Sequence, residues 1–351
     1  MKYRLYFRML RLMDANIDRL SEGLRVLEDV ARFVLGDIKA TETLKRMRHE
    51  LIPADPALKS RLLAARDSES DIGRESPVAR IERKTLIDLV AANARRAQES
   101  LRVLEEFAKL PDCPPEIASR NFEQARFTLY QMEKTLVFGF TRQNRRERIA
   151  GLYVIIDAQT LAGRLTEIEA TGQALKGGAR LIQYRDKARE RREMVAIAGA
   201  MRGLCAEAGA LFIMNDCVDV ALAIDADGVH LGQEDLPFAM ARTILPPHMI
   251  LGCSARTVEQ AIEAEKEGAD YLGVGAIFAS PTKPGAEAIG LHALKTIKKA
   301  VTVPVVAIGG ITEENAHEVI GAGADAVAVI GAVLNSVDIA SATRRLATRI
   351  A

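Results

Sequence analysis

The feature that most constrains the fold of this chain is a regular alternation of strand-like and helix-like segments in its second half. Short runs rich in Val, Ile, Leu and Ala recur eight times, each followed by a stretch with helical periodicity, at residues 152–157, 180–186, 211–216, 228–232, 249–254, 271–278, 303–310 and 326–331. Such alternation is typical of parallel βαβ units. A doubly wound open sheet uses the same units. The count of eight in about 200 residues, and the glycines that end the last two runs, favour a (β/α)₈ barrel, the TIM-barrel fold.

The first half of the chain has a different composition and contains an internal repeat. Glycine is scarce before residue 140, and apolar residues recur at helical spacing among many Arg and Glu residues. The segment D-A-N-I-D-R-L-S-E-G-L-R-V-L-E-D at 14–29 realigns, 77 residues later, with A-A-N-A-R-R-A-Q-E-S-L-R-V-L-E-E at 91–106. Two related helices predict a pseudo-symmetric all-α bundle. The polar positions shared by the two copies are Asn16/Asn93, Arg19/Arg96, Glu22/Glu99, Arg25/Arg102 and Glu28/Glu105.

These two patterns divide the chain into a helical domain at 1–140 and a barrel domain at 150–351. The segment between them, 141–149, begins T-R-Q-N-R-R-E-R and is polar and highly charged. Polar segments between periodic regions commonly connect domains, so we expect a linker there.

Composition argues against several classes of function. The chain has 351 residues and a formal net charge of +1, whereas a nucleic-acid partner usually requires a strong basic excess. No run of about 20 apolar residues occurs, so no membrane span is expected. The four cysteines are scattered without a C-x-x-C pair, and the basic N-terminus lacks the apolar core of a signal peptide. Both features predict a cytoplasmic protein, and a homo-oligomer is compatible with the sequence.

Polar residues collect where the predicted strands end. In a (β/α)₈ barrel the carboxyl ends of all strands meet at one rim, which carries the reactive groups. Alternation in the second strand directs Gln183, Arg185 and Lys187 to one face. The other strand ends contribute Asn215, Asp216, Asp235, Ser254, Ser280, Thr282, Lys283, Gly309, Gly310, Ile330 and Gly331.

The chemistry of this set indicates a site for phosphorylated substrates. Backbone N–H groups exposed by glycines after the last two strands form the usual phosphate site of such barrels. Arg185, Lys187 and Lys283 would bring three positive charges to the rim, more than one phosphate monoester requires. We therefore expect a diphosphate to bind beside a second phosphate. Asp216 and Asp235 supply the oxygen ligands that Mg²⁺ prefers.

Each of these residues also has a purely structural interpretation. Either aspartate could cap a helix, and Lys283 could be solvated. The Gly309-Gly310 pair could form only a tight turn. We interpret His230, inside the fourth strand, as a core histidine whose ring has its hydrogen bonds satisfied; the alternative is a polar role facing the barrel interior. The functional interpretation is favoured because compatible groups converge at several strand ends, which independent caps would not produce.

Seven motifs in the second half resemble the thiamine-phosphate synthase family, also called thiamine-phosphate pyrophosphorylase. They are Q-Y-R-D-K, N-D-C-V-D-V-A-L-A, A-D-G-V-H-L-G-Q-E-D, L-G-C-S-A-R-T, F-A-S-P-T-K-P-G, A-I-G-G-I and V-I-G-A, and they cover nearly all of residues 150–335. The resemblance implies a transferase with small-molecule partners and Mg²⁺ as cofactor. It would join hydroxymethylpyrimidine diphosphate to a thiazole phosphate and release diphosphate. A thiazole tautomerase, the alternative within the same superfamily, would lack the metal aspartates and the basic residues of the second strand.

Carried over position by position, the resemblance implies four groups of site residues. Asp216 and Asp235 would hold Mg²⁺, while Arg185, Lys187 and Lys283 would stabilise the departing diphosphate. No general base is needed, because the attacking thiazole nitrogen has no proton to lose. The thiazole phosphate would be held by Ser280, Pro281, Thr282, Gly310, Ile330 and Gly331. The pyrimidine diphosphate would be bound by Gln183, Tyr184, Arg185, Asp186, Lys187, Asn215, Ser254 and Lys283.

The first half resembles a helical domain found N-terminal to this synthase in some bacteria and proposed to be an alternative hydroxymethylpyrimidine-phosphate kinase. The resemblance is carried by A-N-x-x-R-x-x-E-x-L-R-V-L-E and A-A-R-D-S-E-S-D-I-G. No G-x-x-x-x-G-K-[ST] phosphate loop occurs. The repeated polar residues could line a pocket, or they could form a salt-bridge network between paired helices of a non-catalytic dimerisation or regulatory module. Nearby residues that could join such a pocket are Arg48, His49, Arg66, Asp67 and Asp71.

Overall fold

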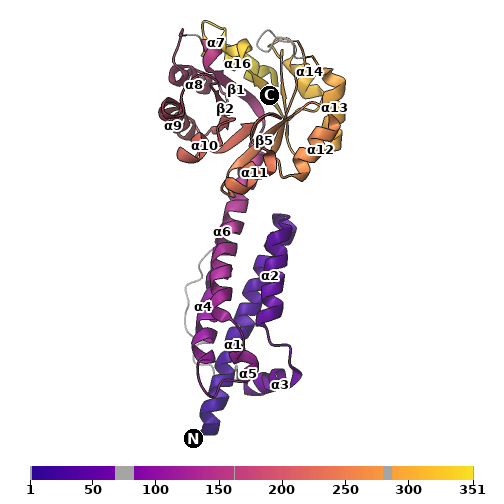
Figure 1. The fold of residues 1–351 in the computed structure, drawn as a ribbon. Coiled ribbons are helices and arrows are strands. Elements are labelled where there is room, and N and C mark those ends of the chain that lie inside the picture. The colour runs from indigo at the N-terminus through magenta and orange to yellow at the C-terminus, as the bar shows by residue number, and fades with distance from the viewer. Residues whose placement is uncertain (1, 68–82, 162, 280–286, 351) are drawn as a thin grey trace. The chain divides into compact units, whose positions relative to one another are not determined.

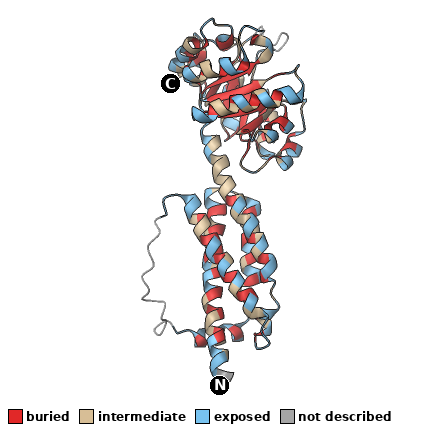
Figure 2. Cartoon of the chain, turned by 90° about the vertical axis from the view of Figure 1, so that its left-hand side faces the viewer, coloured by how far each residue is buried: buried red, intermediate tan, exposed pale blue. Residues whose placement is uncertain are grey.

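The computed structural model describes residues 2–67, 83–161, 163–279 and 287–350. The chain falls into two compact units, Met1–Thr141 and Arg142–Ala351. Within each unit, the buried residues lie on the faces that the helices and strands turn toward one another (Figure 2). Among the described residues, no helix combines the length and apolar character that a membrane span requires.

The first unit is an α-helical bundle, as the sequence predicts (Figure 1). Its two copies of the repeat lie on α1 and α4, which pack closely because their contact face carries small residues. A Cβ atom on Gly23 would lie only 3.1 Å from the carbonyl oxygen of Asn93 and 3.2 Å from the Cβ of Ala97. The helical elements are α1 (Lys2–Asp29), η1 (Val30–Val34), α2 (Ile38–Leu51), α3 (Pro56–Ala65), α4 (Leu86–Ala108), α5 (Pro115–Ala118) and α6 (Phe122–Glu147).

The buried glutamates of the repeat are held in equivalent ion pairs. Glu28 on α1 is 3.0 Å from Nε of Arg48, which lies on the following helix α2. Glu105 on α4 is 3.3 Å from Nε of Arg126, which lies on α6. Both glutamates are nearly inaccessible to solvent. For this position of the repeat, the structure supports the salt-bridge interpretation. The similarity of the two copies also includes the helix that each glutamate binds, α2 for α1 and α6 for α4.

The second unit is a closed barrel of eight parallel strands, in which β8 pairs with β1 (Figure 1). This confirms the predicted (β/α)₈ fold. The strands are β1 (Gly151–Asp157), β2 (Leu181–Arg185), β3 (Leu211–Asn215), β4 (Gly228–Leu231), β5 (Ile250–Ala255), β6 (Tyr271–Val274), β7 (Val305–Ile308) and β8 (Ala326–Val329). The helices between and after them are α7 (Ala158–Leu161), α8 (Glu167–Lys176), α9 (Arg191–Glu207), α10 (Val218–Ala223), α11 (Phe238–Ile244), α12 (Val258–Lys266), α13 (Gly290–Ala300), α14 (Ala316–Gly321), α15 (Gly331–Leu334) and α16 (Ile339–Ile350).

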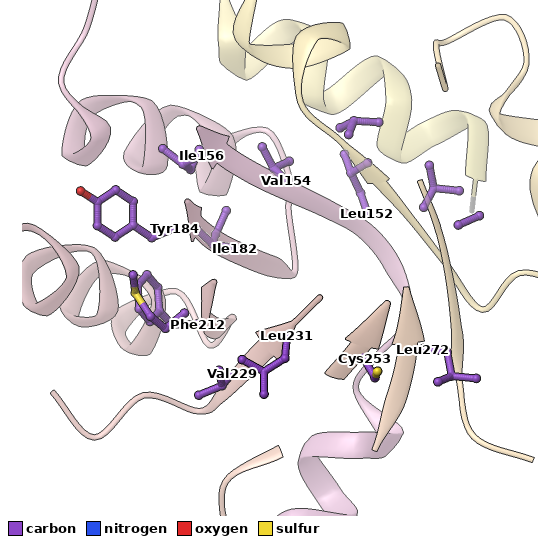
Figure 3. Close-up of a cluster of buried hydrophobic side chains, with 14 of the residues drawn as sticks. Leu152, Val154, Ile156, Ile182, Tyr184, Phe212, Val229, Leu231, Cys253 and Leu272 are labelled. Carbon is purple, nitrogen blue, oxygen red and sulfur yellow. The ribbon is translucent and has the colours of Figure 1, made fainter. Parts of the chain in front are cut away.

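Alternate residues of each strand enter two separate apolar cores. One core fills the barrel interior and includes Leu181, Leu211 and Ile250. The other lies between the strands and the surrounding helices and includes Ile182 and Phe212 (Figure 3). Strand alternation therefore decides which side chains can reach the interior and the rim, and which can only contact helices.

The segment 141–149, predicted to be a linker, is helical as far as Glu147, where α6 ends. Its arginines bond to the barrel unit: Arg142 Nε lies 2.7 Å from Asp270, and Arg145 Nη2 lies 2.8 Å from Asp227. Asp270 and Asp227 immediately precede β6 and β4, so these contacts are made at the amino ends of the strands, away from the rim. The segment predicted to be a linker is therefore helical over most of its length, since Arg, Gln and Glu favour helices. The boundary between the two compact units falls within it, at Thr141 and Arg142.

Candidate active site at the carboxyl ends of the barrel strands

Strand β2 presents its polar residues to both sides of the sheet. Gln183 faces the interior, where its Nε2 donates to the hydroxyl of Tyr153 at 2.9 Å. Tyr184 points the opposite way and is buried in the core beneath the helices (Figure 3). Its hydroxyl donates to Asp186 at 3.2 Å, and Asp186 also accepts the backbone N–H of Ala188 at 2.9 Å. The structure thus brings Gln183 to the interior, whereas Tyr184 and Asp186 stabilise the turn after β2.

Arg185 is oriented by a carboxylate from the neighbouring strand. Its Nη1 donates to Asp157, the last residue of β1, which pairs with Arg185 in the strand register. Asp157 is buried and also accepts the backbone N–H and the hydroxyl of Thr160, at 3.0 and 2.7 Å. Asp157 is not among the residues predicted from the sequence, although it is the last residue of the first predicted strand.

Lys187, Asp216 and Asp235 meet between the ends of β2, β3 and β4. Lys187 Nζ lies 3.6 Å from Oδ2 of Asp216. Burial, and then the nearby carboxyl of Asp235, raise the pKa of Asp216 to about 6, against the opposing influence of Lys187 and Arg185. The structure therefore brings two carboxyl groups together beside two cationic side chains.

The two aspartates do not cap the helices that follow them. The N-cap residue of α10 is Cys217, and that of α11 is Pro237. Asp216 has a left-handed backbone with φ of 60°, which few residues other than Gly, Asn and Asp adopt. Oδ2 of Asp235 instead accepts the backbone N–H of Gly232 at 2.7 Å. The helix-cap alternative from the sequence is thus excluded for both residues.

The two carboxylates suit a cation that keeps part of its water shell. Mg²⁺ commonly binds proteins through one or two carboxylates and completes its octahedron with water and phosphate oxygens. Within the described residues, no group of three or more His, Cys, Asp and Glu side chains is arranged to enclose a metal. A pair of carboxylates beside cationic side chains fits Mg²⁺ shared with a diphosphate better than it fits a fully protein-coordinated metal.

Five polar side chains inside the barrel form a continuous series of hydrogen bonds, which we call the interior polar chain. It runs from Gln183 to Tyr153, Tyr271, His230 and Ser254. Burial lowers the pKa of His230 to about 4, so its ring is neutral near pH 7. The interpretation of His230 as a histidine with satisfied hydrogen bonds holds. The two tyrosines were not selected from the sequence, because an aromatic residue within a buried strand looks like ordinary core.

Asn215 and the glycines after β7 also lie at the rim. Asn215 ends β3 beside His230 of β4 and is buried. Gly309 and Gly310 have φ of 102° and 63°. A Cβ atom on Gly310 would lie 2.5 Å from the carbonyl oxygen of Ala279, so both backbone angle and close approach require glycine there.

Gly310 and Ile330 follow neighbouring strands, β7 and β8. Ile308 pairs with Ala328 in the strand register, and Gly310 and Ile330 each come two residues after one member of that pair. Ile330 is the N-cap residue of α15, whose first residue is Gly331. The remaining predicted site residues, Ser280, Pro281, Thr282 and Lys283, lie outside the described residues.

The helical unit has its own cluster of charges. Arg66, at the start of the A-R-D-S-E-S-D-I-G motif, donates to both carboxylate oxygens of Asp14, at 2.7 and 3.0 Å, and to Asp18 at 2.6 Å. Asp14 is buried, and Arg11 pairs with Asp67 at 3.4 Å. Of the neighbouring residues predicted for this unit, Arg48 binds Glu28, whereas Asp71 lies outside the described residues.

Comparison with known proteins gives two family matches. Residues 152–333 match the thiamine monophosphate synthase family, and residues 11–135 match the ThiD2 family. Among solved structures, thiamine phosphate pyrophosphorylase from Pyrococcus furiosus is 46% identical and superposes with a TM-score of 0.55, over 59% of this chain and 98% of that chain.

Curated relatives match both units of the chain. Thiamine-phosphate synthase of Synechocystis sp. is 40% identical over 341 residues, which cover 97% of this chain and 96% of the relative. Thiamine-phosphate synthase of Thermosynechococcus vestitus is also 40% identical, over 98% of this chain and 95% of the relative. The chain therefore belongs to the thiamine-phosphate synthase family and carries a ThiD2 family region before its barrel.

Proposed function

We propose that the rim of the barrel joins hydroxymethylpyrimidine diphosphate to a thiazole phosphate, producing thiamine phosphate and diphosphate. The observation that carries this assignment is the meeting of Lys187 with Asp216 and Asp235, beside Arg185, at the ends of three neighbouring strands. Cations and a carboxylate pair are the groups needed to hold a diphosphate together with Mg²⁺. A thiazole tautomerase has no leaving diphosphate and no use for this set.

Asp216 and Asp235 are the residues that would hold Mg²⁺. When bound, the metal ion would neutralise charge on the diphosphate and make it a better leaving group. The left-handed backbone of Asp216 is fixed by its N–H, which donates to the carbonyl of His230 at 2.9 Å. Asp235 is fixed by the N–H of Gly232. The backbone of Asp216 and the carboxylate of Asp235 are therefore positioned before a ligand binds, which lowers the cost of assembling the site.

The cationic side chains of the rim act on the diphosphate as it departs. The bond between the pyrimidine methylene carbon and the diphosphate oxygen breaks, and the thiazole nitrogen then bonds to that carbon. Arg185 and Lys187 stabilise the negative charge that develops on the leaving oxygen, with Lys283 assigned to the same role from the family motif. The backbone after β7 and β8, at Gly310, Ile330 and Gly331, together with Ser280, Pro281 and Thr282, is assigned to the thiazole phosphate.

An assay that follows both products tests this proposal. The purified chain is incubated with the two substrates and Mg²⁺, and thiamine phosphate and diphosphate are quantified together. We expect the two products in equal amounts, and neither product when one substrate is omitted. Diphosphate release without thiamine phosphate would instead identify a hydrolase.

For the helical unit, we propose phosphorylation of hydroxymethylpyrimidine phosphate by ATP, which would supply the diphosphate substrate of the barrel. The match of residues 11–135 to the ThiD2 family supports this assignment. Incubating the full chain with the pyrimidine monophosphate and ATP should yield ADP and the pyrimidine diphosphate. If neither forms, a non-catalytic dimerisation or regulatory role is the remaining assignment.

A further inference from the structure

The interior polar chain connects two residues that the proposed function assigns to the same substrate. Gln183 Nε2 lies 2.9 Å from the hydroxyl of Tyr153, which lies 3.1 Å from the hydroxyl of Tyr271. Tyr271 is 3.2 Å from Nδ1 of His230, and Nε2 of His230 is 2.9 Å from Oγ of Ser254. The chain therefore crosses the barrel from β2 to β5 through side chains of β1, β6 and β4.

The donor at one end decides the direction of every hydrogen bond in this chain. An amide N–H can only donate, so the hydroxyl of Tyr153 accepts from Gln183 and donates its own proton to the hydroxyl of Tyr271. Tyr271, having accepted, donates to Nδ1 of His230. A neutral imidazole whose Nδ1 accepts carries its proton on Nε2, and that proton goes to Ser254. The hydroxyl proton of Ser254 is then left to be donated outside the chain.

Both tyrosines and the histidine are held in place by the surrounding strands. Tyr153 and Tyr271 are almost fully buried, and burial raises the pKa of each phenol far above neutrality, so both keep their protons. A Cβ atom on Gly252 would lie 2.2 Å from Cζ of Tyr271. A Cβ atom on Gly273 would lie 2.8 Å from Cε1 of His230. The rings of Tyr271 and His230 thus occupy the space that a side chain at Gly252 or Gly273 would fill.

We propose that this ordered chain makes Ser254 a hydrogen-bond donor to the bound pyrimidine substrate, with Tyr153, Tyr271 and His230 as positioning residues that act through it. The inference rests on the proposed function for the identity of the ligand, although the order of protons is a property of the free protein. A serine whose proton is already directed outward does not reorient when the ligand binds, so its hydrogen bond forms at lower cost.

The tautomer of His230 tests the proton order without any substrate. Nitrogen NMR of protein labelled at histidine distinguishes a protonated from an unprotonated ring nitrogen, and a His230→Gln sample assigns the signal among the five histidines. We expect Nε2 of His230 to carry the proton and Nδ1 to lack it at pH 7. A proton on Nδ1 would mean that the chain runs in the opposite direction, with Ser254 donating to His230, and would overturn the proposal.

A double-mutant cycle tests the positioning role. Tyr271→Phe removes the central hydroxyl and keeps the ring, and we expect it to lower kcat/KM for the pyrimidine substrate by about tenfold, the size of one hydrogen bond. In a Ser254→Ala background, the same change should have almost no further effect, because it acts through Ser254. Additive losses would show that Tyr271 supports only the fold and would overturn the proposal.

Thr171→Val is the matched control for losing a buried hydroxyl. Thr171 is fully buried in α8, and its Oγ1 donates to the carbonyl of Glu167 at 2.7 Å, outside the rim. The Thr171→Val substitution should leave kcat/KM unchanged, both in the unsubstituted protein and in the Ser254→Ala background. If the unsubstituted protein makes no thiamine phosphate, the proposed function fails. The tautomer of His230 still decides whether the hydrogen bonds of the interior polar chain are donated toward Ser254.

Discussion

The ammonium group of Lys187 lies 3.6 Å from a carboxylate oxygen of Asp216, and this ion pair joins the loops after β2 and β3. Asp216 is at the same time within the influence of a second carboxyl, that of Asp235. One cationic side chain therefore approaches a pair of carboxylates that would otherwise repel each other. Such a pair is ready to accept a second cation, which is the basis of the metal assignment.

Removing the charge of Asp216 should abolish most of the activity. We expect Asp216→Asn to lower kcat by about 100-fold or more at saturating Mg²⁺, the scale of losing one main electrostatic group. Asp219→Asn is a matched control, because Asp219 is exposed on α10 and pairs only loosely, at 3.3 Å, with Arg191. Near-normal turnover of Asp216→Asn, measured as thiamine phosphate formed per second, would contradict the metal assignment.

The ion pair between Asp157 and Arg185 should matter for substrate use and less for folding. Asp157→Asn keeps an acceptor for the backbone N–H of Thr160 but loses the charge that orients Arg185. We expect kcat/KM for the pyrimidine diphosphate to fall by about tenfold, since a misplaced cation stabilises the leaving group less well. Thr160→Val removes a hydrogen bond to Asp157 without removing its charge and should change kcat/KM by less than about threefold. Equal effects of the two variants would refute this role.

Arg142 should stabilise the barrel unit although it lies outside the predicted barrel boundary. Arg142→Ala leaves the buried carboxylate of Asp270 with its bond from the N–H of Leu251 and a longer contact to Arg242. We expect a loss of about 2 kcal/mol in the free energy of unfolding, below the full cost of breaking a buried pair because those partners remain. Loss of synthase activity in urea reports on this unit. Asn144→Ala, at an exposed position, is the control, and the same midpoint for both variants would contradict the expectation.

The two copies of the repeat should respond alike to loss of their buried glutamates. Glu28→Gln and Glu105→Gln each weaken one ion pair to the following helix, with Arg48 and Arg126 respectively. We expect each to lower the unfolding free energy of the helical unit by about 1–2 kcal/mol, measured from its circular dichroism in urea. Glu22→Gln, on the exposed face of α1, should have little effect. A loss in only one copy would contradict the functional equivalence of the two pairs.

Much of the fold and part of the site could be predicted because they depend on local pattern. Strand alternation correctly directed Gln183 and Arg185 to one side, where they bond to Tyr153 and Asp157. The same alternation sends the side chain of Tyr184 to the opposite side, where it lies in the core between the strands and the helices. The eight strands followed from periodicity, since each is a short apolar run bounded by turn residues.

What could not be predicted depends on contacts across the barrel. The distance between the hydroxyls of Tyr153 and Tyr271, 3.1 Å, arises between β1 and β6, 118 residues apart. It requires the room that Gly252 leaves for the Tyr271 ring, and no local pattern links these positions. The continuation of α6 through Arg142 was missed for the same reason, because its partner Asp270 lies far along the chain.

Formation of thiamine phosphate with and without Mg²⁺ tests the central claim most directly. The full chain, stripped of metal with EDTA and dialysed, is given hydroxymethylpyrimidine diphosphate and the thiazole phosphate, and thiamine phosphate is quantified as Mg²⁺ is added back. We expect no product above background without the metal and a saturable increase with Mg²⁺, which the Asp216→Asn variant lacks. The absence of thiamine phosphate at saturating Mg²⁺, or an undiminished rate in EDTA, would contradict the assignment.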